Sequence, residues 1–73
     1  MTRVIDIKNK EQIQRINQLA CEAPYEVWLS TETVMLDARS LLSLYSLVGQ
    51  QAKVVTEDEV DPEALNRLVR KMS

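Results

Sequence analysis

Apolar side chains recur along this chain with two different periods, and the periods divide it into seven short segments. Spacing at i, i+3 and i+4 predicts three helices, over residues 9–23, 40–48 and 61–72. Short runs rich in β-branched and aromatic side chains predict four strands, near residues 4–7, 25–29, 33–36 and 52–56. The predicted order is therefore β-α-β-β-α-β-α.

Residues that favour helix ends support these boundaries. Asn9 is a good N-cap, and Gln12 three residues later fits a capping box. Ser40 is expected to cap the second helix, and Gly49 to end it in the left-handed conformation. The third helix is expected to start at Asp61-Pro62-Glu63, because an acidic N-cap followed by proline is typical of a first helical turn.

Polar residues 30–32 separate the second and third strands and predict a hairpin. Successive side chains of a strand point to opposite faces of the sheet. The residues expected to face the helices are Val27, Leu29, Val34 and Leu36. Trp28 and Met35 then face away, and Val54 joins them if Val55 points inward. The expected fold is a two-layer α+β open-faced sandwich, with three helices on one face of a four-stranded antiparallel sheet.

Length and composition predict one small domain over residues 1–73, with 45% hydrophobic and 27% charged residues. Nine basic and eleven acidic residues give a net charge of −2, which argues against nucleic-acid or anionic-membrane partners. The single cysteine, Cys21, cannot form an internal disulfide and suits a reducing compartment. The N-terminus has no long apolar run, so neither a signal peptide nor a membrane span is expected, and the cytoplasm is the expected location.

The chain contains no histidine, which excludes a histidine base, a histidine metal ligand and a phosphohistidine. No combination of acid, base and nucleophile can be assembled from the other residues, so neither catalysis, a cofactor nor a metal is expected. Cys21 is interpreted as a small half-buried apolar residue on the first helix. The acidic residues of segment 57–63 lack the ligand pattern of a calcium loop and are interpreted as a solvated loop.

Three stretches in the last two-thirds of the chain share register with one family. They are Ala38-Arg39-Ser40-Leu41-Leu42-Ser43-Leu44-Tyr45-Ser46-Leu47, Val54-Val55-Thr56 and the final helix Ala64–Met72. With the element order, they resemble HPr, the histidine-containing phosphocarrier protein of the bacterial sugar phosphotransferase system. The resemblance implies an HPr-like fold.

The chain departs from this family where the family carries out its chemistry. HPr proteins accept a phosphoryl group on a histidine in a Gly-x-His-x-Arg-Pro type loop before the first helix. Here the stretch is Ile7-Lys8-Asn9-Lys10-Glu11-Gln12, without the glycine, histidine, arginine or proline. Asn9 lies near the histidine's place, and an amide cannot carry a phosphoryl group. No catalytic residue is therefore transferred from the family.

One serine does match. In many family members an ATP-dependent kinase phosphorylates the serine that opens the second helix, and Ser40 occupies that position. The resemblance implies a regulatory protein that contacts partner proteins, such as an HPr-type serine kinase or a transcriptional regulator, through Arg39, Leu42 and Tyr45. The alternative for Ser40 is an unmodified helix cap.

A second hypothesis needs no phosphorylation. The chain could be an interaction module that has kept only the fold and forms a homodimer. Its self-association surface would be Trp28, Met35 and Val54 on the open face of the sheet.

Overall fold

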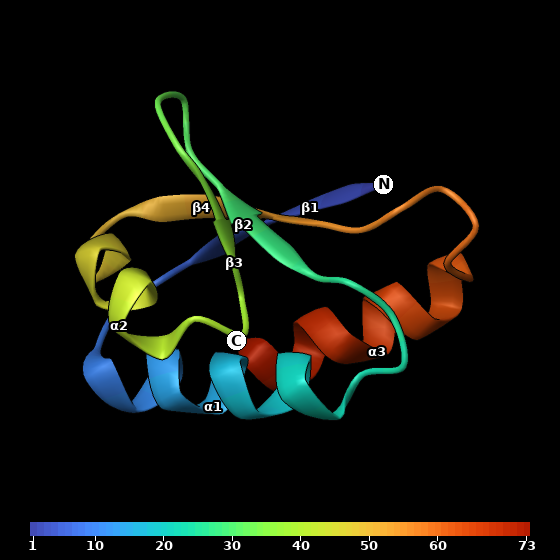
Figure 1. The fold of residues 1–73 in the computed structure, drawn as a ribbon, viewed down its shortest axis with the longest axis horizontal. Helices are drawn as coiled ribbons and strands as arrows, with labels where there is room; N and C mark the ends of the chain where they lie inside the picture. The colour runs from blue at the N-terminus through green and yellow to red at the C-terminus, as the bar shows by residue number, and fades with distance from the viewer.

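The computed structural model describes residues 1–73 and shows the predicted order of elements (Figure 1). The strands are β1 (Thr2–Asp6), β2 (Trp28–Ser30), β3 (Met35–Asp37) and β4 (Gln51–Val55). The helices are α1 (Lys10–Glu22), α2 (Leu41–Leu44) and α3 (Pro62–Met72), and a 3₁₀ turn, η1 (Tyr45–Leu47), continues α2. Helices α1 and α3 lie along one face of the sheet, with α2 at one end of this layer (Figure 1). The α+β sandwich is confirmed.

All neighbouring strands pair antiparallel, in the order β1-β4-β2-β3. The long pair β1 and β4 is in register from Thr2 with Val55 to Asp6 with Gln51. The β2–β3 hairpin rises from the sheet on the side away from the helices (Figure 1). Its strands begin later than the sequence predicts, at Trp28 and Met35, and each contains three residues.

A single cluster of buried apolar residues fills the space between the sheet and the helices. Ile13 and Ile16 of α1 and Leu65 of α3 are completely buried in it. Burying such a side chain stabilises the fold by about 1.5–3 kcal/mol each. The first and third helical patterns are thus confirmed as core-facing stripes. No helix has both the length and the apolar character needed to cross a membrane.

Two predictions about the faces of the sheet are wrong. Val54 is completely buried on the helix side, and Val55 lies half-buried on the open face. The charged Lys53 must point to solvent, and alternation then turns Ala52 and Val54 inward. Val34 does not share a buried face with Leu36, because it lies in the hairpin turn and is exposed.

The second helix is much shorter than the predicted 40–48 segment, because only four residues are α-helical before η1 begins. Leu41, Leu44 and Leu47 recur at intervals of three, and three residues per turn is the period of a 3₁₀ helix. This spacing keeps all three leucines on the core side in the tighter helix. Gly49 follows with a φ of +88°, a conformation that glycine adopts most readily.

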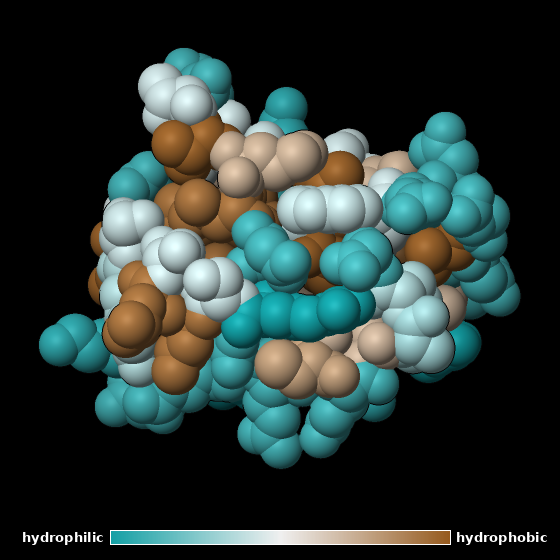
Figure 2. All heavy atoms as spheres, in the orientation of Figure 1, coloured by the Kyte–Doolittle hydropathy of each residue, from teal (hydrophilic) through white to brown (hydrophobic).

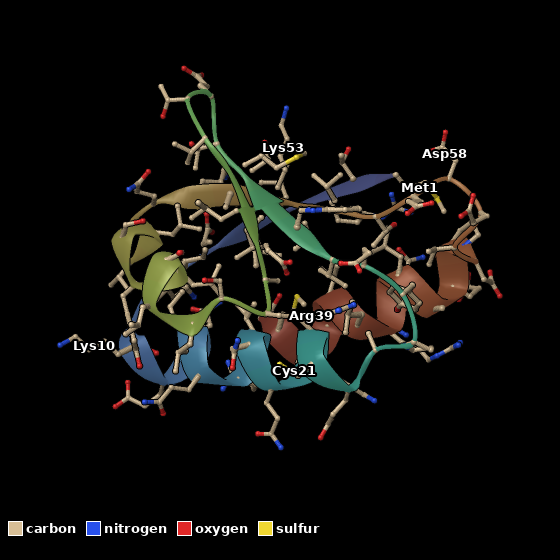
Figure 3. The ribbon with its side chains drawn as sticks, viewed as in Figure 1. Met1, Lys10, Cys21, Arg39, Lys53 and Asp58 are labelled. Atoms are coloured by element: carbon tan, nitrogen blue, oxygen red, sulfur yellow. The ribbon has the colours of Figure 1, made fainter.

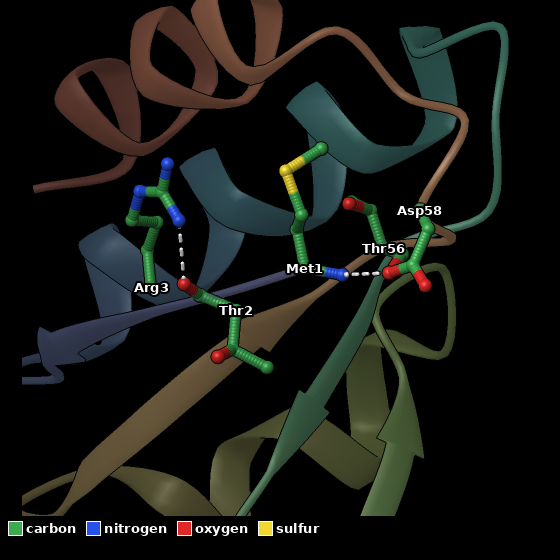
Figure 4. A network of polar contacts seen from close by, with 5 residues as sticks. All are labelled: Met1, Thr2, Arg3, Thr56 and Asp58. Carbon is green, nitrogen blue, oxygen red and sulfur yellow. Dashed lines mark hydrogen bonds and ion pairs between the residues drawn. The ribbon is translucent and has the colours of Figure 1, made fainter.

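The chain's own side chains cover part of the free edge of β1. Met1 hydrogen-bonds to Thr56 and Ile7 to Gln50 and Gly49, on either side of β4, so alternation turns the backbone groups of Thr2, Val4 and Asp6 to the edge. The Arg3 guanidinium donates to the Thr2 carbonyl at 2.8 Å (Figure 4), and the Gln12 amide donates to the Asp6 carbonyl at 2.8 Å.

The start of β1 is fixed to the loop after β4. The Met1 ammonium donates to the Thr56 carbonyl at 2.7 Å and to the Asp58 carboxylate at 3.1 Å (Figure 4).

Candidate functional site

The segment before α2 is anchored to the rest of the fold on two sides. Ala38 is completely buried, and its N–H donates to the Val27 carbonyl at 3.0 Å. Its own carbonyl accepts from the Asn17 side chain of α1 at 3.1 Å. Asp37 closes the turn by accepting from the backbone N–H groups of Arg39 and Ser40. The start of α2 is therefore held on a rigid base.

Ser40 is the N-cap residue of α2, as predicted, but its side chain does not cap the helix. The hydroxyl instead lies 3.1 Å from the Ser43 hydroxyl, and the residue is exposed. Four α-helical residues give only a small dipole, so the helix dipole would stabilise an added phosphate only weakly. What the structure provides at Ser40 is an accessible hydroxyl that no backbone group requires.

Arg39, predicted to be a partner-binding residue, forms an ion pair within the chain. Its guanidinium lies 3.3 Å from the Glu26 carboxylate. Both side chains are more than one-third exposed, so solvent screening makes the pair worth little. The pair therefore leaves Arg39 able to exchange Glu26 for another anion at small energetic cost.

Leu42 and Tyr45 differ in how far they reach from the core. Leu42 is 84% exposed, more than any other large apolar side chain of the molecule. Tyr45 is half-buried, packs against the core, and its hydroxyl accepts from the Gln14 amide at 3.3 Å. Figure 2 shows apolar surface over α2 and along the hairpin. Together Ser40 and Leu42 present a hydroxyl and an aliphatic group on one short helix.

At the start of α1, where the resemblance places the family's phosphoryl acceptor, two side-chain amides hydrogen-bond to backbone groups. Asn9 accepts from the Gln12 N–H at 2.9 Å, which confirms the predicted cap. The Gln12 side chain is buried, accepts from the Lys8 N–H at 2.8 Å and donates to the Asp6 and Met72 carbonyls at 2.8 and 3.1 Å. It therefore ties β1, α1 and the end of α3 together. No nucleophile lies in this network.

Acidic residues line a cleft of about 620 Å³ between the start of β2 and the start of α3. The hydrogen bond that protonated Glu57 donates to the Glu59 carboxylate, and then the negative charge of Glu59, raise the pKa of Glu57 above its ordinary value. No group of three His, Cys, Asp or Glu side chains is placed to hold a metal ion. The cleft is a solvated acidic surface.

Cys21 is exposed on α1 (Figure 3), which corrects the expectation of a half-buried residue. It follows the completely buried Ala20, so its side chain lies just off the apolar stripe of the helix.

The open face of the sheet brings together side chains from all four strands. Trp28 lies there half-buried, and Met35 is 57% exposed. Val4 and Val55 join them, and Val54 does not. Sequence reasoning missed Val4 and Val55, although the charge at Lys53 was a signal for the facing of β4. Figure 3 shows Lys53 pointing away from the helices beside the hairpin.

Comparison with known proteins agrees with this architecture. No protein-family model matches the chain, and no curated protein matches it in sequence. Among solved structures, the crystal structure of HPr-C-His from Thermoanaerobacter tengcongensis matches with a TM-score of 0.76 at 24% sequence identity. The match covers 99% of this chain and 90% of that chain. The fold is HPr-like. The HPr-like fold here carries no histidine and has an amide network at the start of α1.

Proposed function

We propose that this chain is a regulatory relative of the HPr phosphocarriers that has lost phosphocarrier chemistry and acts by protein–protein contact through α2. The observation that carries the proposal is an HPr-like fold in a chain without histidine, with its most exposed large apolar side chain, Leu42, beside the accessible Ser40 hydroxyl. An exposed leucine is a surface that a partner protein can bury.

We further propose that phosphorylation of Ser40 by an HPr-type serine kinase gates this contact. A phosphate would add about 1.5–2 negative charges next to Leu42. It would also compete with Glu26 for Arg39, and that weak surface pair offers little resistance. Phosphorylation would thus change both the charge and the side-chain arrangement of the contact surface.

The test is the intact mass of the protein after incubation with an HPr-type serine kinase and ATP. We expect one added phosphate, which is lost in Ser40→Ala. Ser43→Ala is the matched control, because its hydroxyl is exposed on the same turn, 3.1 Å from that of Ser40. An unchanged mass with a kinase that modifies HPr itself, or loss of the phosphate in Ser43→Ala alone, contradicts the proposal.

A second candidate function is a self-association module that has kept the fold and needs no phosphorylation. The exposed Val4 and Met35 favour it, because both lie on the open face of the sheet, which no helix covers.

A further inference from the structure

The register of the sheet places the open-face side chains in rows that run across the strands. One row reads, from β1 to β3, Val4, Lys53, Ser30 and Met35. The next row reads Thr2, Val55, Trp28 and Asp37. Each row therefore has a definite sequence of apolar, polar and charged groups.

Each row is complementary to a second copy of itself laid against it in the reverse strand order. Reversal of the first row sets Val4 against Met35 and Lys53 against Ser30. Reversal of the second row sets Val55 against Trp28 and Thr2 against Asp37. Apolar groups then meet apolar groups, and no charge meets a like charge. Such self-complementarity is what a two-fold interface requires, since each residue must suit the position that its symmetry mate contacts.

From this pattern we propose that the open sheet face is the interface of a homodimer, whose two-fold axis runs along the strands between β4 and β2. This inference deepens the second candidate function and does not depend on Ser40. A standard interface buries roughly 800 Å² on each partner, about a fifth of the 4476 Å² that this chain exposes. The whole open face, hairpin included, must therefore take part.

The hairpin and the groove beside it supply the remaining complementarity. The groove holds about 500 Å³ and is lined by Val4, Gln51 and Lys53 on one side and by hairpin residues Ser30, Thr31 and Thr33 on the other. The proposed axis places each copy's hairpin over β4 and β1 of its partner, within the partner's groove.

Charge favours the same arrangement. Lys53 has no carboxylate within 4.0 Å in the monomer, and the exposed Glu32 stands at the tip of the hairpin. Facing sheets lie about 10 Å apart, a distance that a lysine and a glutamate can bridge together. Glu32 of one copy can therefore reach the unpaired Lys53 ammonium of the other copy.

The first experiment is sedimentation equilibrium of the full chain over a range of concentrations. We expect reversible dimers that Met35→Glu weakens by tenfold or more in dissociation constant. Leu42→Glu is the matched control, since it adds the same charge at an exposed apolar residue outside the face, and it should leave the dimer unchanged. A wild-type chain that stays monomeric up to about 1 mM, or equal effects of both variants, overturns the proposal.

A second experiment tests the axis. In a Cys21→Ser background, Val4→Cys and Met35→Cys are prepared separately and treated with a short bismaleimide crosslinker. Two copies of one variant place their thiols at opposite edges of the interface, about 14 Å apart across three strand spacings. The mixture should crosslink as a Val4→Cys with Met35→Cys pair, and neither variant alone should. Equally efficient crosslinking of single variants, or none in the mixture, rejects this geometry and leaves the Ser40 proposal unaffected.

Discussion

The starts of α1 and α2 differ in what their N-cap side chains do. Each has a residue type that favours the N-cap, Asn9 or Ser40, but only Asn9 uses its side chain to accept a backbone N–H. At α1 the neighbouring Gln12 adds three more hydrogen bonds to backbone groups. At α2 the serine bonds only to another hydroxyl. The side chains at the start of α1 satisfy backbone groups and stabilise the fold, whereas the Ser40 hydroxyl at the start of α2 satisfies no backbone group and stays accessible.

Replacement of Gln12 should produce the largest effect. Gln12→Ala leaves the Lys8 N–H and the Asp6 carbonyl without their side-chain partner, and it leaves the Met72 carbonyl with only the Arg15 guanidinium at 3.5 Å. We expect the free energy of unfolding to fall by about 2–3 kcal/mol, measured by urea denaturation. Gln14→Ala, an exposed residue on the same helix, is the control and should change it by less than about 0.5 kcal/mol. Equal effects of the two changes would show that the network contributes no stability.

Loss of the Asn9 cap should produce a smaller effect. Asn9→Ala removes one acceptor from the first turn of α1, which typically costs about 1 kcal/mol. Asp61→Ala removes the equivalent acceptor from α3 and should cost a similar amount. Denaturation midpoints of both variants, at an unchanged slope, measure this. A negligible change in either would mean that water replaces the side chain fully.

Ser40→Ala should hardly change stability, because the serine hydroxyl caps no backbone group. We expect a change within about 0.5 kcal/mol in the same denaturation experiment. A loss near 1 kcal/mol would reveal a capping interaction in solution and would remove the contrast with Asn9.

These contrasts also show what could be predicted from the sequence. The long helices were predictable because Ile13, Ile16 and Ala20 combine spacings of three and four, as do Leu65, Leu68 and Met72, and this combination is the pattern of a buried α-helical stripe. The short helix was not, since a spacing of three between leucines fits a 3₁₀ helix as well as an α-helix. The adjacent valines 54 and 55 gave no preference between faces, and only Lys53 decided it.

The candidate site was predictable in part. Ser40 starts the second helix, as predicted, and is exposed near Leu42, but the ion pair of Arg39 with Glu26 and the hydrogen bond of Tyr45 with Gln14 depend on tertiary contacts. No local pattern encodes which distant side chain a flexible arginine will meet. The same holds for Gln12, whose partner Met72 lies sixty residues away.

The smallest predicted effect is a pH dependence of stability that arises in the loop before α3. The pKa of Glu57 is raised in the folded state, chiefly through Glu59, so the folded chain binds a proton at Glu57 more readily than the unfolded chain. Stability should therefore rise slightly as pH falls through the raised pKa toward the ordinary carboxyl value. In Glu57→Gln, thermal unfolding should show this rise diminished, with stability at neutral pH equal to or slightly above wild type. Added salt should shrink the difference, and a rise that persists in the variant would assign it to another carboxylate.

The partly covered edge of β1 has a consequence for how copies of this chain can join. An open strand edge lets one sheet add to the next without limit, which is how fibrils grow. Here Arg3 and Gln12 occupy the edge carbonyls of Thr2 and Asp6, and the opposite edge, β3, is only three residues long. Lateral addition is therefore disfavoured at both edges, and association through the open face, as proposed, would end at two copies, because each copy uses that face once.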